Sequence, residues 1–313
     1  MTDDPRFDSA HTVLAADRYR RSRGVWRLVA FLALALAVVA LVGRFALWDV
    51  GTTGRIARVV IDGTITTSRE RQEALTALAE DDRVKAVIVS INSPGGSTAG
   101  GEELYEALGV LRAQKPVVSV INELGASAAY MTAIGTERIF ARRLSIVGSI
   151  GVLYQHVNAG KLLDTVGIDL DKVASGPLKA EPDFDEPITG EVRASIASMV
   201  DDSFNWFVDV VAERRGLPRP QALTLADGRI VSGRVALENG LIDAIGGEAE
   251  AIAWLAAERD VAADLPVVTV WPREGEGIGW FTRFVGDKAR AAFGLPAGSG
   301  AVPLDGLVSL WQV

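Results

Sequence analysis

Residues 84–121 read VKAVIVSINSPGGSTAGGEELYEALGVLRAQKPVVSVI, and this stretch decides the fold. Its first eight residues, 84–91, are almost wholly apolar, which is typical of a strand buried on both faces. A turn with two glycines follows, then a helical stretch over residues 98–114 and a second apolar strand over residues 116–121. Buried strands that alternate with helices predict an α/β domain with parallel strands covered by helices.

The same alternation continues on both sides of this stretch. Further strands are expected at residues 58–65, 138–141 and 147–154, and further helices at residues 68–81, 126–134 and 189–215. The long helix over 189–215 is amphipathic and ends at Gly216 and Pro218, as helices commonly do. The pattern is lost beyond about residue 260, so residues 261–313 are assigned no fold apart from a possible helix at 280–293.

Composition excludes several kinds of chemistry. Of 313 residues, 49% are hydrophobic and 23% charged, which indicates a globular chain with a sizeable core. The absence of cysteine excludes disulfides, thiolate metal sites and a cysteine nucleophile, and two histidines are too few for a zinc site built on several imidazoles. A net charge of -8 argues against nucleic acid as a partner. We expect neither a metal nor another cofactor.

The N-terminal region predicts a membrane anchor at residues 28–48. Residues 28–43, LVAFLALALAVVALVG, carry no charge, and with their flanks they reach the ~20 residues that cross a bilayer. Residues 41–48, LVGRFALW, lack the small residues of a signal-peptide cleavage site. Five arginines within residues 18–27 crowd the end of the tail 1–27 that adjoins the apolar run, so we expect the tail in the cytoplasm and the chain after the linker 49–55 outside.

Two loops, one α/β unit apart, are candidates for chemistry. Residues 92–97 contain Gly95 and Gly96, whose N–H groups at a helix entrance suit an anion or a developing oxyanion. Ser127 lies among very small residues at a strand-to-helix elbow, at the edge where α/β sheets place their sites. Taken singly, the first is also an ordinary turn and the second an ordinary helix cap. Together they place a nucleophile beside an oxyanion hole.

A serine nucleophile needs a base, and the residues leave two kinds open. His156 follows a strand downstream of Ser127, without an obvious carboxylate to orient it. A lysine in an apolar pocket can lose its charge near neutral pH and accept the proton. Lysines are few here, and Lys179 lies in the turn-rich segment before the long helix, whereas Lys85 and Lys172 are placed as strand edges.

These features together resemble the bacterial signal peptide peptidase A family, serine proteases of the S49 group that share the fold of Clp protease and the crotonases, with repeated ββα units and a parallel sheet. The resemblance covers about residues 56–255. Its elements are the anchor, NSPGG at 92–96, Ala-Ser-x-x-Tyr at 126–130, Gly-Ser-Ile-Gly-Val at 148–152, Ser-Gly-x-x-Lys at 175–179, and Asp-Gly-Arg to Gly-Leu-Ile-Asp at 227–243.

The resemblance implies a role for each candidate residue. Ser127 is then the nucleophile and Lys179 the general base, with Ser149 placed to hydrogen-bond the lysine. Gly95 or Gly96 and the N–H of Ala128 would form the oxyanion hole. Alanines at 128 and 129 stand where the family commonly has glycines, and the acidic residues within 176–187 would raise the pKa of a nearby lysine.

The resemblance also implies a biological setting. Residues 56–260 would form the peptidase domain of a single-pass endopeptidase of the bacterial inner membrane, with its catalytic domain on the extracytoplasmic side. Several copies would form a homo-oligomeric ring over the membrane, whose apolar grooves take cleaved signal peptides or other hydrophobic peptides. The lysine of one subunit would reach the serine of the next. The alternatives are a crotonase-like acyl-CoA enzyme, which should face the cytoplasm, and a proteolytically silent membrane scaffold.

Overall fold

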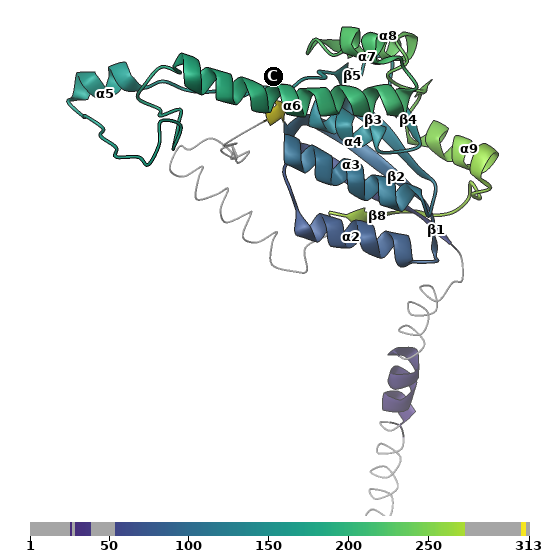
Figure 1. Ribbon diagram of the computed structural model, residues 1–313. Helices are drawn as coiled ribbons and strands as arrows, with labels where there is room; N and C mark the ends of the chain where they lie inside the picture. Colours follow the sequence, from purple (N-terminus) through teal and green to yellow (C-terminus); the bar gives the residue numbers. More distant parts are fainter. Residues whose placement is uncertain (1–25, 27–28, 39–53, 273–307, 311–313) are drawn as a thin grey trace, which may run out of the picture. The chain divides into compact units, whose positions relative to one another are not determined.

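The computed structural model describes residues 26, 29–38, 54–272 and 308–310 (Figure 1). The chain divides into two compact units, residues 1–53 and 54–313. In the first unit residues 29–38 are helical, and apolar side chains such as Phe31 and Leu36 are exposed. The remainder of the predicted anchor 28–48 lies outside the described residues. Within the described part of the chain, no helix has both the length and the apolar character to cross a membrane.

The second unit is built on one mostly parallel sheet. Its centre consists of three long parallel strands, β1 (Arg55–Ile65), β2 (Val84–Ser97) and β3 (Val117–Ala126). The strand order is β6-β5-β3-β2-β1-β8, with β4, β7 and β9 paired off this path. The outer strands are β4 (Arg138–Ala141), β5 (Ile146–Gly148), β6 (Ile230–Ser232), β7 (Ala244–Ile245), β8 (Val267–Trp271) and β9 (Val308–Leu310).

The predicted α/β class is confirmed, but the sheet is mixed. β5 pairs with β6 and β2 pairs with β9 in antiparallel fashion, whereas the other pairs are parallel. β8, which pairs with β1, comes from the region that the sequence left without a fold. The predicted helix at 280–293 lies outside the described residues.

Helices cover both faces of the sheet (Figure 1). Because successive side chains of a strand point to opposite faces, Val87, Val89 and Ile91 of β2 pack into one apolar cluster and Ala86 and Ile88 into the other. The first cluster takes residues from α2 (Arg69–Glu80), α3 (Thr98–Arg112), α4 (Ala128–Ile134) and α6 (Gly190–Arg215), and the second from α9 (Glu248–Arg259). The remaining helices are α5 (Gly160–Val166), α7 (Arg219–Leu225) and α8 (Gly233–Glu238).

Two predicted boundaries are wrong because pairing between distant segments overrides the local pattern. The predicted turn at 92–97 continues β2, since Thr64 and Ile65 of β1 pair with Gly95 and Gly96. A Cβ at Gly96 would lie 1.8 Å from the carbonyl oxygen of Ile65, so only glycine permits this approach. The strand expected over 147–154 ends at Gly148, where positive φ at two successive residues breaks the extended backbone.

The chain leaves the sheet after β5 and forms an arm, residues 151–189, before it returns through α6. α5 lies in this arm and has no buried residue. Figure 1 shows α5 and its connection to α6 extending beyond the sheet. The arm therefore contrasts with the core, in which most residues of β2 and β3 are buried.

Candidate active site

Ser127 occupies a strained elbow between β3 and α4. Its φ of 60° and ψ of -121° are sparsely populated by residues other than glycine. The residue is 1% exposed, and its N–H donates to the carbonyl oxygen of Gly148 at 2.8 Å. Its side chain makes no capping hydrogen bond to α4, so the interpretation of Ser127 as an ordinary helix cap is wrong. The elbow holds the hydroxyl in a conformation that helix capping does not explain.

Ser149 lies directly beside this elbow. Ala126 of β3 pairs with Gly148 of β5. Ser127 and Ser149 are the residues that directly follow this pair in their two strands. Ser149 also has a positive φ, of 51°, and its N–H donates to the carbonyl oxygen of Arg229 at 2.7 Å. Sequence reasoning missed this role of Arg229, although the Asp-Gly-Arg turn was noted. That turn fixes the backbone of Ser149.

The two candidate oxyanion glycines are not equivalent. Gly95 has a φ of 106°, and its N–H donates to Oγ of Ser93 at 3.1 Å, so this donor is already engaged. Gly96 follows on the same edge of β2. Ala128 is the first residue of α4, where an N–H has no partner inside the helix and φ is negative. The alanine that replaces a family glycine therefore keeps the required donor.

The first turns of α3 and α4 are packed closely against each other. A Cβ at Gly101 would lie 3.0 Å from Cβ of Ala128 and 2.8 Å from Sδ of Met131. A cavity of about 290 Å³ opens beside these turns. It is lined by Thr98, Ala99, Glu102, Met131, Asp202, Ser203 and Trp206. An apolar floor with two carboxylates thus lies near the start of both helices.

Tyr130 explains why the elbow motif and the 227–243 motif occur together. Its hydroxyl donates to the carbonyl oxygen of Leu241 at 2.8 Å, and complete burial raises the pKa of Tyr130. Two residues further on, Asp243 accepts from the N–H of Ile139 at 2.8 Å and pairs with Arg215 at 2.7 Å. These buried bonds attach α4 and the sheet to the second half of the domain.

Lys179 and the serine that it is predicted to serve lie in different surroundings. Lys179 is exposed in the arm, and its N–H donates to the carbonyl oxygen of Gly176 at 3.1 Å. The predicted nucleophile Ser127 is buried in the core, whereas the predicted base lies on the surface of the arm.

The acidic residues near Lys179 are engaged by another lysine. Nζ of Lys172 pairs with Oε1 of Glu181 at 2.5 Å and also with Asp183. The hydrogen bonds that Lys172 donates to Asp183 and then to Glu181 raise the pKa of Lys172. Lys172 is thus an ion-pair partner inside the arm rather than a strand edge. The pair neutralises two of the carboxylates that were expected to raise the pKa of Lys179.

The other candidate bases lie elsewhere. Nε2 of His156 contacts the carbonyl oxygen of Glu186 at 3.0 Å within the arm. Lys85 is exposed and donates to the carbonyl oxygen of Asp82 at 2.8 Å. No group of three or more His, Cys, Asp or Glu side chains in the described part of the chain is arranged to hold a metal ion.

Comparisons with known proteins agree on one family. The profile of peptidase family S49 matches residues 110–262, and that of Clp protease matches residues 55–155. A protein of Synechocystis sp. named as a candidate protease is 36% identical over 214 residues, which cover 67% of this chain and 77% of that protein.

Two further relatives carry more specific names. An Enterococcus faecium protein named as a candidate signal peptide peptidase is 31% identical over 224 residues, 71% of this chain and 64% of that protein. A chloroplast serine protease of Arabidopsis thaliana is 28% identical over 219 residues, 67% of this chain but 32% of its own length.

Proposed function

The chain belongs to peptidase family S49 and is a serine protease, and from this premise we propose that it is a membrane-anchored endopeptidase that degrades released signal peptides and similar apolar peptides. We assign Ser127 as the nucleophile and Lys179 as the general base. The strained, buried elbow at Ser127, whose side chain does not cap α4, carries this proposal.

The proposed reaction uses the roles assigned to these groups. Oγ of Ser127 attacks the scissile carbonyl carbon while its proton passes to Nζ of Lys179. The N–H groups of Gly96 and Ala128 hold the resulting oxyanion. Lys179 then protonates the leaving amine, and a water that Lys179 deprotonates hydrolyses the acyl-serine ester. We assign to Ser149, which follows the residue whose carbonyl accepts from the N–H of Ser127, the role of orienting the lysine amine.

Lys179 is proposed to serve the serine of a neighbouring copy in a homo-oligomeric ring. The arm that carries it is rich in exposed apolar side chains, including a wholly exposed Val173. Apolar surface of this extent is typical of an interface. The exposed apolar residues of the arm are Leu153, Val157, Leu162, Val166, Ile168, Leu170, Val173, Leu178 and Phe184. Docking of this surface would both bury it and bring an amine to the elbow.

The substrate is proposed to bind in an extended conformation. The backbone of Gly95–Ser97 pairs antiparallel with Val308–Leu310, so this edge of β2 accepts a strand. The cavity with Met131 and Trp206 on its wall offers a place for an apolar side chain of such a peptide. The name of the Enterococcus relative supports signal peptides as the substrate class.

The proposed setting is the bacterial inner membrane, with the peptidase domain on the extracytoplasmic side. The apolar run at 28–43 and the arginines before it support this orientation. Protease added to intact spheroplasts should digest the chain after Trp48. Complete protection would show that the domain faces the cytoplasm.

Labelling with a serine-directed fluorophosphonate tests the assignment of the nucleophile. The wild-type protein should carry one adduct, which mass spectrometry places on Ser127, and Ser127→Ala should carry none. Ser203→Ala, at a serine that lines the neighbouring cavity, is the matched control and should label like wild type. Labelling of Ser149 or Ser93, or none in a folded protein, would contradict the proposal.

A further inference from the structure

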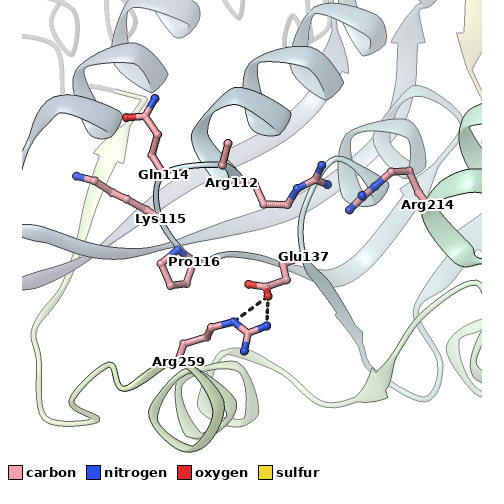
Figure 2. A pocket seen from close by; sticks show the side chains of 8 residues that line it. Arg112, Gln114, Lys115, Pro116, Glu137, Arg214 and Arg259 are labelled. Atoms are coloured by element: carbon pink, nitrogen blue, oxygen red, sulfur yellow. Dashed lines mark hydrogen bonds and ion pairs between the residues drawn. The ribbon is translucent and has the colours of Figure 1, made fainter.

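A basic pocket lies at the edge of the sheet opposite Ser127. β3 runs from Val117 to Ala126, and this pocket of about 490 Å³ surrounds the start of that strand. Figure 2 shows four cationic side chains and one carboxylate around it. The cations are Arg112, Lys115, Arg214 and Arg259, and the carboxylate is Glu137.

Two of the guanidinium groups are fixed by backbone carbonyls just past the end of α4. Nη1 of Arg112 donates to the oxygen of Gly135 at 3.0 Å. Arg214 donates through Nε to Ile134 and through Nη2 to Thr136, both at 2.9 Å. Carbonyls at a helix C-terminus lack helical partners and attract cations. A guanidinium has five N–H donors, so these bonds fix both groups and leave further donors on each.

The pocket holds more positive charge than its own acid balances. Glu137 is bound by Arg259, and Nζ of Lys115 is held by the backbone oxygens of Leu78 and Asp81 at 2.7 and 2.5 Å. Burial, and then the charge of Arg112, lower the pKa of Arg214. The positive charges of Arg112 and Arg214 therefore lie close together in this pocket, although the net charge of the chain is -8.

Capping of α4 explains the bonds of Arg112 and Arg214, but it does not explain why four cations line one cavity. We propose that this pocket binds a phosphate group, held between Arg112 and Arg214 with Lys115 and Arg259 at its rim. Guanidinium forks match the geometry of phosphate oxygens and offset their charge. The phosphate is either a free anion or the headgroup of an anionic lipid. β1 also begins at this edge of the sheet, with Arg55.

Calorimetric titration of the purified full-length protein in detergent with inorganic phosphate tests the site. We expect saturable binding, weakened at least tenfold in Arg112→Gln and in Arg214→Gln. Arg69→Gln, which removes an exposed i,i+4 pair on α2, is the matched control and should bind like wild type. No binding by wild type, or equal binding by all these proteins, would overturn the proposal.

A second variant distinguishes binding from a purely structural role. Glu137→Gln removes the carboxylate of the pocket without touching a bond to α4, so phosphate should bind about threefold to tenfold more tightly. Loss of the arginine caps cannot produce such a gain, and an unchanged affinity in Glu137→Gln would count against the site. This comparison remains decisive if the arginine variants fail to fold.

Short-chain lipids then separate the two sources of phosphate. Dioctanoyl phosphatidylglycerol should compete with inorganic phosphate, whereas dioctanoyl phosphatidylcholine should not, if the pocket takes an anionic headgroup. Phosphate binding without competition by either lipid assigns the site to the free anion. Competition that persists unchanged in Arg214→Gln would place lipid binding elsewhere and contradict the proposed site.

Discussion

The elbow at Ser127 and the arm around Lys179 are built in opposite ways. The elbow is buried and is fixed by a hydrogen bond that Ser127 donates to β5 and one that it accepts from α4, and these surroundings hold its strained backbone. The arm is exposed, carries unburied apolar side chains and includes one short helix. The comparison indicates that the fold of one chain is sufficient to fix the backbone of Ser127, the proposed nucleophile, whereas Lys179, the proposed base, stays exposed on the arm.

The largest expected effect is at the base. Lys179→Arg keeps the positive charge but cannot accept a proton, so hydrolysis of a peptide substrate should fall by about 10²–10⁴-fold. Because Lys179 is exposed, the melting temperature should stay that of wild type. Lys172→Arg, which preserves the ion pairs with Glu181 and Asp183, is the matched control and should keep full activity. An active Lys179→Arg protein would exclude this lysine as the base.

A glycine-to-alanine substitution, which adds one methyl group, should lower the free energy of unfolding far more in the core than in the arm. Gly96→Ala places a Cβ against the oxygen of Ile65 and should cost about 4 kcal/mol or prevent folding, the range of severe core substitutions. Gly176→Ala in the arm meets nothing within 4 Å and should stay within about 0.5 kcal/mol of wild type. Urea denaturation measures both, and equal values would show that β2 does not hold Gly96 against β1.

The smallest effect is expected at the histidine of the arm. His156 contacts a backbone oxygen and neither serine, so His156→Ala should retain activity to within about tenfold, less than loss of a general base costs. Steady-state kinetics of both variants with the same peptide substrate gives the comparison. A loss of several decades in His156→Ala, with Lys179→Arg active, would assign the base to His156.

The sequence predicts those parts of the core whose structure is determined by residues close together in the chain. The apolar runs of β2 and β3 report burial on both faces, and the small residues around Ser127 mark the elbow. The role of Ser149 beside the lysine came only through the family resemblance, and it stays a prediction. In each case the residues that identify the element are neighbours in the chain, or belong to a motif with fixed order.

What the sequence could not predict depends on partners far along the chain. The extension of β2 through Gly96 is caused by pairing with β1, and the end of β5 by successive positive φ values where Ser149 bonds to the backbone of Arg229. Likewise, Glu181 pairs with Lys172 and not with Lys179 because of how the arm folds. Local pattern carries no signal for any of these contacts.

The central claim is that the site is completed by two chains, and mixing two inactive variants tests it most directly. Ser127→Ala keeps the lysine and Lys179→Ala keeps the serine, so each alone should be inactive. After unfolding and joint refolding in equal amounts, about a quarter of the ring contacts should pair an intact serine with an intact lysine, and activity should return to about that fraction. Differently tagged variants that co-purify as mixed oligomers yet remain inactive would contradict the account.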